Sequence, residues 1–251
     1  RTARTALDQA GFGHLPLIAG AGGHSVQLAI QSVHAAHAAG ASHVLVLPSS
    51  YYPAQIGRPG AREFYTQLAD SSPVPILIYS YPGVSAGIDL DSELVADLAH
   101  HPNIRGVKHT DHNIGKMARH CALPSAADAD AASFFVLGGA SDYYIGALAV
   151  GAHGTITGMG NIAPRAVVRL QQLWDQGKYE EARSLQGLVS VAEWELGKGG
   201  VPMHKALVVA TRGYGGAPRR PLQPSAKAAV AQAERGFAAL MQLERKLERE
   251  A

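Results

Sequence analysis

Short apolar runs along the chain alternate with longer stretches in which apolar residues recur every three or four positions. The runs are residues 15–20, 43–48, 75–80, 104–109, 134–139 and 154–159. They begin about 20 to 32 residues apart, which is the spacing of a repeated βα unit. Near-continuous apolar strands are needed where helices cover both faces of a parallel sheet. The pattern therefore predicts six parallel strands in an α/β fold.

The stretches between and after these runs predict helices. Four lie among the strands, at residues 25–40, 60–72, 90–101 and 142–151, and four follow them, at 164–177, 179–196, 201–213 and 225–250. Asp89 or Asp91 is a suitable N-cap for the third helix. We therefore divide the chain into βα-barrel units, residues 1–160, and a C-terminal helical region, residues 161–251, packed on the barrel.

The number of strands leaves two architectures open. A closed barrel needs eight strands, so either two more precede Arg1 or the sheet is open. The first residues, RTARTALDQAGFGHLP, lack an initiator Met and read like the end of a helix, which leads us to expect that a leading segment is absent.

Composition limits the classes of function. Hydrophobic residues make up 47% of the chain and charged residues 17%, as in a globular enzyme, and no apolar run could cross a membrane. The net charge of +2 and the scattered basic residues argue against a nucleic-acid partner. The single cysteine, Cys121, excludes an internal disulfide. The N-terminus has no apolar signal core, so we expect a cytoplasmic protein, with a mitochondrial location left open.

Lys108 ends the fourth predicted strand, in the segment NIRGVKHT. Loss of hydration there favours the neutral amine, which is a nucleophile toward carbonyl carbons. Lys108 is therefore a candidate for Schiff-base formation. The alternative is a strand-end lysine that reaches into solvent or pairs with Asp111.

Other polar or conformationally special residues also follow predicted strands. They are Tyr79, Gly138, Gly139 and the segment Ser49, Ser50, Tyr51 and Tyr52. In a βα barrel the carboxyl ends of all strands open on one face, where catalytic groups collect. This convergence favours the catalytic interpretation of Lys108 and of Tyr79.

Five segments carry a resemblance to a known family. They are LPLIAGAGGHS, YSYPGVSAGIDLD, HPNIRGVKHT, LGGASDYYIGALAVGAHGTITGMGNIAP and RGYGGAPRRPLQ. In this order and spacing they resemble the dihydrodipicolinate synthase and N-acetylneuraminate lyase family of pyruvate-dependent class I aldolases, over essentially the whole chain. The resemblance implies a (β/α)8 TIM barrel with extra C-terminal helices, whose first two strands are absent here, so that residues 1–160 hold strands 3 to 8.

The resemblance also implies roles for individual residues. Lys108 would form an imine with a 2-oxo acid, Tyr79 would shuttle protons beside it, and the backbone around Ile156 and Gly138 would line the pyruvate site. Tyr51 or Tyr52 would reach into the site of a neighbouring subunit of a homodimer or homotetramer. No metal or other cofactor is implied, and the partner is a small 2-oxo acid.

Two departures from the family pattern bear on the substrate. The loop that holds the 2-oxo acid carboxylate is not in this sequence, and the synthases' arginine after the tyrosine is replaced by Val84 and Ser85. Ser85, Ser80 or Thr110 could instead meet the hydroxyls of a sugar acid. The resemblance is therefore greatest to the fungal 3-deoxy-2-oxo-hexonate aldolases, then to 4-hydroxy-2-oxoglutarate aldolases, and dihydrodipicolinate synthesis is disfavoured.

Three other interpretations remain. The glycines of GAGGHS resemble a dinucleotide-binding turn, but no acidic residue lies between Asp8 and Glu63 to hold a ribose. His109, Asp111 and His112 could belong to a metal-dependent aldolase, although histidine spacing alone is a weak signal. The chain could also be a catalytically silent relative that serves as a binding protein.

Overall fold

The computed structural model describes residues 1–123 and 134–250. The chain divides into two compact units, Arg1–Leu137 and Gly138–Ala251.

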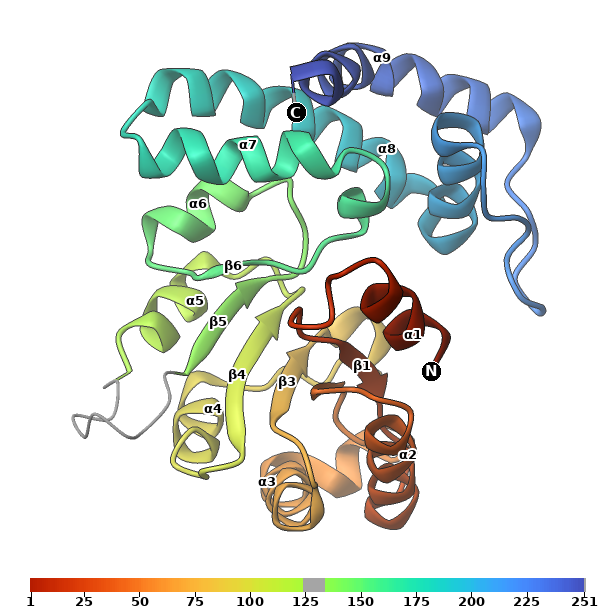
Figure 1. Cartoon of the computed structure of the whole chain (residues 1–251). Helices are drawn as coiled ribbons and strands as arrows, with labels where there is room; N and C mark the ends of the chain where they lie inside the picture. The colour runs from red at the N-terminus through yellow and green to blue at the C-terminus, as the bar shows by residue number, and fades with distance from the viewer. Residues whose placement is uncertain (124–133, 251) are drawn as a thin grey trace. The chain divides into compact units, whose positions relative to one another are not determined.

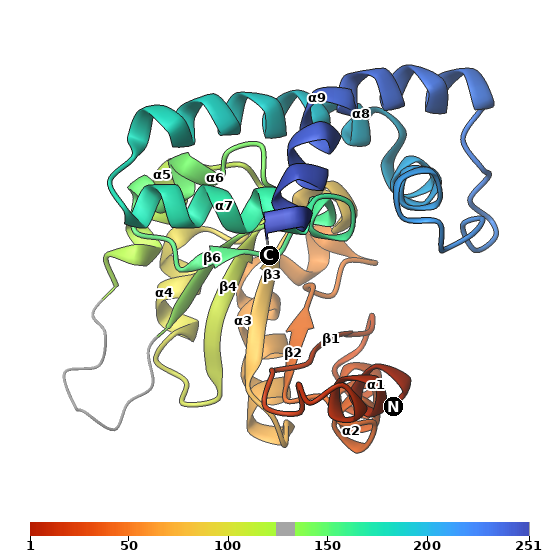
Figure 2. The same cartoon turned by 45° about the horizontal axis from the view of Figure 1, so that its top comes forward.

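The first unit alternates strands and helices (Figure 1). Its elements are α1 (Thr2–Gln9), β1 (Ile18–Ala21), α2 (Val26–Ala38), β2 (His43–Val46), α3 (Pro53–Ser71), β3 (Ile76–Ser80), the 3-10 turn η1 (Pro82–Val84), α4 (Ser92–Leu98), β4 (Ile104–His109), α5 (Ile114–Cys121) and β5 (Phe135–Gly138). The strands lie in chain order, β1 to β5, and β1, β2, β3 and β4 pair in parallel. Helices α2 to α5 follow one another along the sheet, as Figures 1 and 2 both show.

Side-chain caps begin three of these helices. The Ser25 hydroxyl accepts a hydrogen bond from the Leu28 backbone N–H at 3.2 Å, and the Asp91 carboxylate accepts one from Leu94 at 2.7 Å. Asp91, and not Asp89, is therefore the cap of α4. Asn113 caps α5. The apolar spacing did not predict α5, because it is short and carries several polar residues.

The second unit is mainly helical. Its elements are α6 (Tyr144–Ala149), β6 (Gly154–Thr155), the 3-10 turn η2 (Gly158–Asn161), α7 (Pro164–Asp175), α8 (Tyr179–Arg212) and α9 (Lys227–Glu250). A kink at Gly200, with φ of 54°, divides α8 into the two helices that the sequence predicts. Within this unit, the Ile156 N–H just after β6 donates to the carbonyl of Gly138, the last residue of β5, at 2.9 Å.

Glu244 joins the helices of the second unit. Its buried carboxylate accepts hydrogen bonds from the backbone N–H groups of Arg165 and Ala166 at the start of α7, at 3.2 and 2.8 Å. It also pairs with Arg212 of α8 at 2.9 Å. A side chain of α9 thus caps α7, which has no cap of its own.

The six predicted strands and the α/β class are confirmed. Helices α7, α8 and α9 all follow residue 160, while the division into compact units falls at residues 137 and 138. The domain boundary at residue 160 stays a prediction.

Candidate active site

Lys108 and Tyr79 lie side by side at the carboxyl ends of β4 and β3. The two residues are direct partners in the parallel pairing of these strands. The Lys108 Nζ donates a hydrogen bond to the Tyr79 hydroxyl at 3.0 Å and lies 4.1 Å from the centre of the ring. Only 8% of Lys108 is exposed, so its amine does not reach into solvent. The sequence alternative of a solvated lysine is therefore wrong.

The other alternative was a pair between Lys108 and Asp111. In the structure, the Asp111 side chain binds other residues. The Asp111 carboxylate accepts hydrogen bonds from the Ser80 hydroxyl, from His109 Nδ1 and from Lys116 Nζ, at 3.0, 3.1 and 2.9 Å. Ser80 is buried by this contact, which removes it from the hydroxyls expected to meet a sugar acid. Sequence reasoning missed this cluster because its members come from two strands and a helix that was not predicted.

The Lys108–Tyr79 contact brings an amine and a phenol together. An amine at the end of an apolar strand can add to a carbonyl carbon, and a phenol 3.0 Å away is within reach for proton transfer. The Tyr81 ring lies 5.7 Å from the Tyr79 ring and packs beside it. The arrangement has the parts that imine chemistry needs.

Two buried hydroxyls of the first unit have no hydrogen-bond partner among the described residues. They are the Ser85 Oγ and the Thr110 Oγ1. A buried hydroxyl without a partner costs free energy, so each is suited to a polar group of a ligand. Thr110 directly follows β4, and its N–H extends the strand pairing to the Ser80 carbonyl at 2.8 Å.

The loop after β3 is held in an unusual backbone conformation. Ala86 has φ of 51°, a left-handed value that is costly for a residue with a Cβ. Ser85 before it is fully buried, whereas Val84 is 52% exposed. A cavity of about 270 Å³ lies between this loop and the start of α3, and Arg58 lines it while pairing with Asp91 at 3.6 Å.

Tyr51 and Tyr52 are exposed, 67% and 60% respectively, just before α3. Their rings meet edge to face at 4.7 Å between centres, and the His24 ring lies 5.8 Å from Tyr51. The described chain does not bury either ring. Their contact with a neighbouring subunit stays a prediction.

Gly138 and Ile156 lie together in the second unit, where the Gly138 carbonyl accepts hydrogen bonds from the Ile156 N–H and, at 3.2 Å, from the Thr155 hydroxyl. Their approach to Lys108 stays a prediction.

A partly buried carboxyl group in the second unit was not predicted. Glu193 of α8 accepts a hydrogen bond from the Ser141 backbone N–H at 3.2 Å and another from the Ser141 hydroxyl. Burial raises the pKa of Glu193, although the hydrogen bonds from Ser141 oppose the increase. Gln186 and Ser190 of the same helix bind the Ser141 and Asp142 carbonyls, so one face of α8 holds the loop after β5. The helical period of α8 gives no signal for this polar contact.

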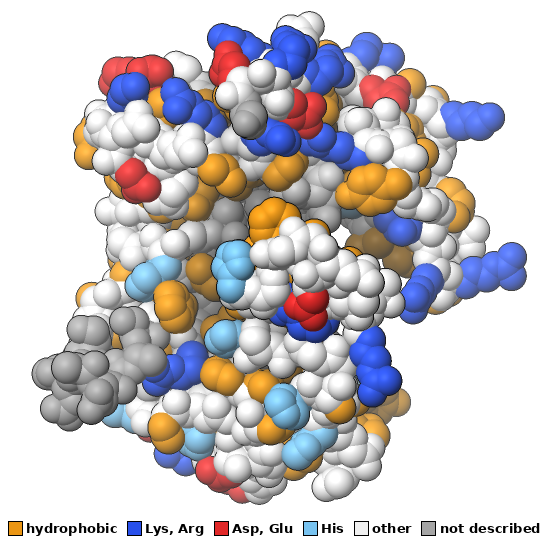
Figure 3. Space-filling model, viewed as in Figure 1, with side chains coloured by type: hydrophobic (Ala, Val, Ile, Leu, Met, Phe, Trp, Pro, Cys, Tyr) orange, Lys and Arg blue, Asp and Glu red, His pale blue; other side chains and the backbone are white. Residues whose placement is uncertain are grey.

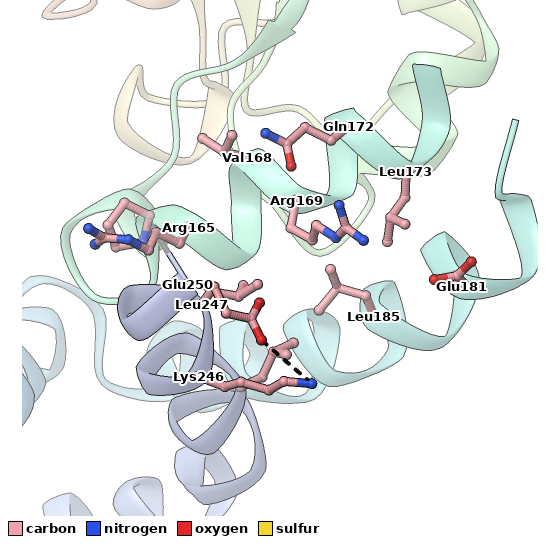
Figure 4. Close-up of a pocket in the computed structure, with 12 residues that line it drawn as sticks. Arg165, Val168, Arg169, Gln172, Leu173, Glu181, Leu185, Lys246, Leu247 and Glu250 are labelled. Carbon is pink, nitrogen blue, oxygen red and sulfur yellow. Dashed lines mark ion pairs between the residues drawn. The ribbon is translucent and has the colours of Figure 1, made fainter. Parts of the chain in front are cut away.

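A surface groove of about 770 Å³ lies among α7, α8 and α9 (Figure 4). Arg165, Arg169 and Lys246 line it together with Glu181 and Glu250, so its charge is mixed. None of the predicted site residues belongs to it.

Three further observations concern charge, membrane-spanning helices and metal-binding groups. On the face that Figure 3 shows, the described Lys and Arg side chains lie in several separate places, some of them beside acidic side chains. Among the described helices, none is long and apolar enough to span a membrane. Within residues 1–123 and 134–250, no three His, Cys, Asp or Glu side chains are grouped so that they could hold a metal ion.

Comparison with known proteins identifies the family. The family model described as the dihydrodipicolinate synthetase family matches residues 2–239. A protein of Emericella nidulans named as a probable mitochondrial 4-hydroxy-2-oxoglutarate aldolase is 41% identical over 246 residues, which are 98% of this chain and 77% of that protein. The L-threo-3-deoxy-hexylosonate aldolase of Hypocrea jecorina is 39% identical over 247 residues, 97% of this chain and 78% of the relative.

A solved structure supports the same assignment. A dihydrodipicolinate synthase family protein from Coccidioides immitis has a TM-score of 0.84 and 32% identity, with 98% of this chain and 78% of that chain covered. The resemblance read from the sequence motifs is thus confirmed, and the chain belongs to the dihydrodipicolinate synthetase family.

Proposed function

We propose that this chain is a class I aldolase that cleaves a 2-oxo-3-deoxy sugar acid to pyruvate and an aldehyde, with Lys108 as the imine-forming residue and Tyr79 as the proton carrier. The observation that carries the assignment is the contact between the buried Lys108 amine and the Tyr79 hydroxyl at 3.0 Å. The family membership supports a lyase, and the aldolase names of the relatives support this reaction class.

The chemistry follows from these two groups. The Lys108 amine adds to C2 of the 2-oxo acid, and loss of water gives a protonated imine, which draws electrons from the C3–C4 bond. When that bond breaks, its electron pair forms an enamine at C3, and the C4 hydroxyl loses its proton as the aldehyde forms. Tyr79 can take this proton only if it passes its own on, for example to the substrate carboxylate. Protonation at C3 and addition of water then release pyruvate and the free amine.

The loop after β3 supports a sugar acid as substrate. Residues 81–91 contain no Lys or Arg, so the loop offers no cation to a second carboxylate. The unpartnered hydroxyls of Ser85 and Thr110 are suited to substrate hydroxyls. A buried carboxylate without a partner costs far more than an unmet hydroxyl.

A second candidate substrate is 4-hydroxy-2-oxoglutarate, named for the Emericella nidulans relative. Arg58, in the cavity beside the loop after β3, is the cation that could serve its second carboxylate. Substitution of Arg58 by Gln distinguishes the two substrates, because only the dicarboxylate should lose kcat/KM.

Further expectations belong to this proposal. We infer that the six strands form part of a (β/α)8 barrel and that the protein is a homodimer or homotetramer to which the exposed Tyr51 and Tyr52 contribute. No cofactor is proposed. The name of the Emericella nidulans relative includes the word mitochondrial, so we propose a mitochondrial location beside the cytoplasmic one.

Borohydride reduction in the presence of pyruvate tests the imine. The full chain should gain one pyruvyl adduct by mass spectrometry, located at Lys108 by peptide mapping. Lys108→Ala should lose both the adduct and the turnover, whereas Lys198→Ala, which alters an exposed lysine, should keep both. Activity lost with EDTA but without trapping would favour a metal-dependent aldolase. Absence of both activity and trapping would favour a silent relative.

A further inference from the structure

Two pairs of residues lie at the ends of β3 and β4 and face opposite ways. Tyr79 pairs with Lys108 in the strand register, and Ser80 pairs with His109 one position later. Successive side chains of a strand point to opposite faces of the sheet. Ser80 and His109 therefore lie behind the candidate catalytic pair, and both are buried.

Asp111 connects the two strands on that side. Its carboxylate accepts a hydrogen bond from Ser80 of β3 at 3.0 Å and from His109 of β4 at 3.1 Å. A third comes from Lys116 of α5 at 2.9 Å, and the Asn113 N–H donates a fourth at 3.2 Å. One carboxylate thus ties both strand ends to the helix that follows them.

The contacts around Asp111 are strong because they are charged and shielded from water. Burial of the Asp111 carboxylate acts to raise its pKa, but hydrogen bonds and charge from His109 and Lys116 outweigh burial and hold the pKa well below its usual range. Lys116 is also buried and pairs with Asp89 as well. The carboxylate is therefore ionised at neutral pH and accepts charge-assisted hydrogen bonds, which are shorter and stronger than neutral ones.

We propose that Asp111 is a positioning residue for the reaction, and that it acts by fixing the ends of β3 and β4 so that the Lys108 amine and the Tyr79 hydroxyl stay in contact. The role rests on the proposed aldolase function. Asp111 does not touch the pair itself: it holds Ser80 and His109, which adjoin Tyr79 and Lys108 in sequence. A misplacement of reacting groups by about 1 Å can cost about 10²-fold in rate.

This role differs from ordinary stabilisation in what it predicts. Loss of an ion pair that only stabilises the fold lowers the amount of folded protein. Each molecule that still folds remains as active as before. A positioning residue lowers kcat for each correctly folded site. Trapping of pyruvate by borohydride counts the sites that can form an imine, so kcat divided by trapped sites separates the two roles.

Two variants and one control test the proposal. Asp111→Asn keeps the shape of the side chain but removes its negative charge and one of its two acceptor oxygens. The variant therefore loses the charge-assisted hydrogen bonds from His109 and Lys116. Ser80→Ala removes only the link to β3 and creates a small gap. Glu244→Gln is the control, because it weakens a buried carboxylate that also joins several elements but lies in the second unit.

We expect kcat per trapped site to fall by about 10- to 100-fold in Asp111→Asn and by about 3- to 10-fold in Ser80→Ala, with KM changed far less. In Glu244→Gln the melting temperature should fall while kcat per trapped site stays at the wild-type value.

An unchanged kcat per trapped site in Ser80→Ala and in folded Asp111→Asn would overturn the positioning role while leaving the aldolase function intact. If Asp111→Asn fails to fold, Ser80→Ala decides the question alone. A wild-type chain that neither traps pyruvate nor cleaves substrate would instead overturn the proposed function, and the positioning role with it.

Discussion

Removal of the Tyr79 hydroxyl is the most direct test of how the Lys108–Tyr79 pair works. Tyr79→Phe keeps the ring, its place beside Tyr81 and its contact with the Lys108 amine, and deletes only the oxygen that accepts the 3.0 Å hydrogen bond. The variant should therefore fold normally, and Lys108 should still form an imine with pyruvate.

The larger expected loss is in proton transfer. A positioned general acid or base contributes about 10² to 10⁴ in rate, which is about 3 to 6 kcal/mol of barrier at about 1.4 kcal/mol for each factor of ten. The hydrogen bond from Lys108 is lost as well, which adds about 0.5 to 1.5 kcal/mol. Because the amine stays beside the ring, loss of the hydrogen bond should only slow imine formation. Loss of proton transfer, the larger effect, should slow cleavage of the C3–C4 bond.

Two assays separate these steps. Borohydride trapping at timed intervals measures imine formation, and release of pyruvate from the 2-oxo-3-deoxy acid, measured with a coupled dehydrogenase, gives kcat. We expect trapping to remain within about tenfold of wild type while kcat falls by the larger factor. A kcat within twofold of wild type would show that Tyr79 only packs, and equal losses in both assays would show that it serves imine formation alone.

Three further predictions concern substrate choice and stability. With Val84 and Ser85 in place of an arginine, kcat/KM should be greatest for a six-carbon 3-deoxy-2-oxo acid and lower for 4-hydroxy-2-oxoglutarate, with little condensation of pyruvate with aspartate semialdehyde; preference for the semialdehyde would contradict our account of this loop. Glu244→Gln should lower the free energy of unfolding in urea by about 1 to 3 kcal/mol, because its buried partners lose a charged acceptor, and an unchanged value would show that α9 docks without this contact. Burial lowers the pKa of His120 to about 4 from its ordinary value of 6.5, so the unfolded chain binds more protons than the folded one between these values, and stability should fall as the pH drops from about 6.5 to 4. His120→Gln should reduce that slope in melting experiments, and the same slope in the variant would exclude His120 as its source.

The sequence alone determined the approximate bounds of the strands and placed the candidate lysine at the end of one of them. Runs such as 75–80 and 104–109 are so uniformly apolar that only a covered parallel strand fits them, and the structure has β3 and β4 at nearly the same bounds. A strand of known bounds fixes which residue stands at its end, so Lys108 and Tyr79 could be selected without coordinates.

Tertiary structure decided what each polar residue contacts. Ser80 and Asp111 are 31 positions apart, and the alternation of side chains along β3 could not show that the Ser80 hydroxyl is held by Asp111 on the face behind the reactive pair. Nor could the pattern of α9 show that Glu244 lies at the start of α7, 78 positions earlier. Periodicity reports which face of an element is apolar, but a hydrogen bond between distant elements depends on how those elements pack, and that information is absent from any local window of sequence.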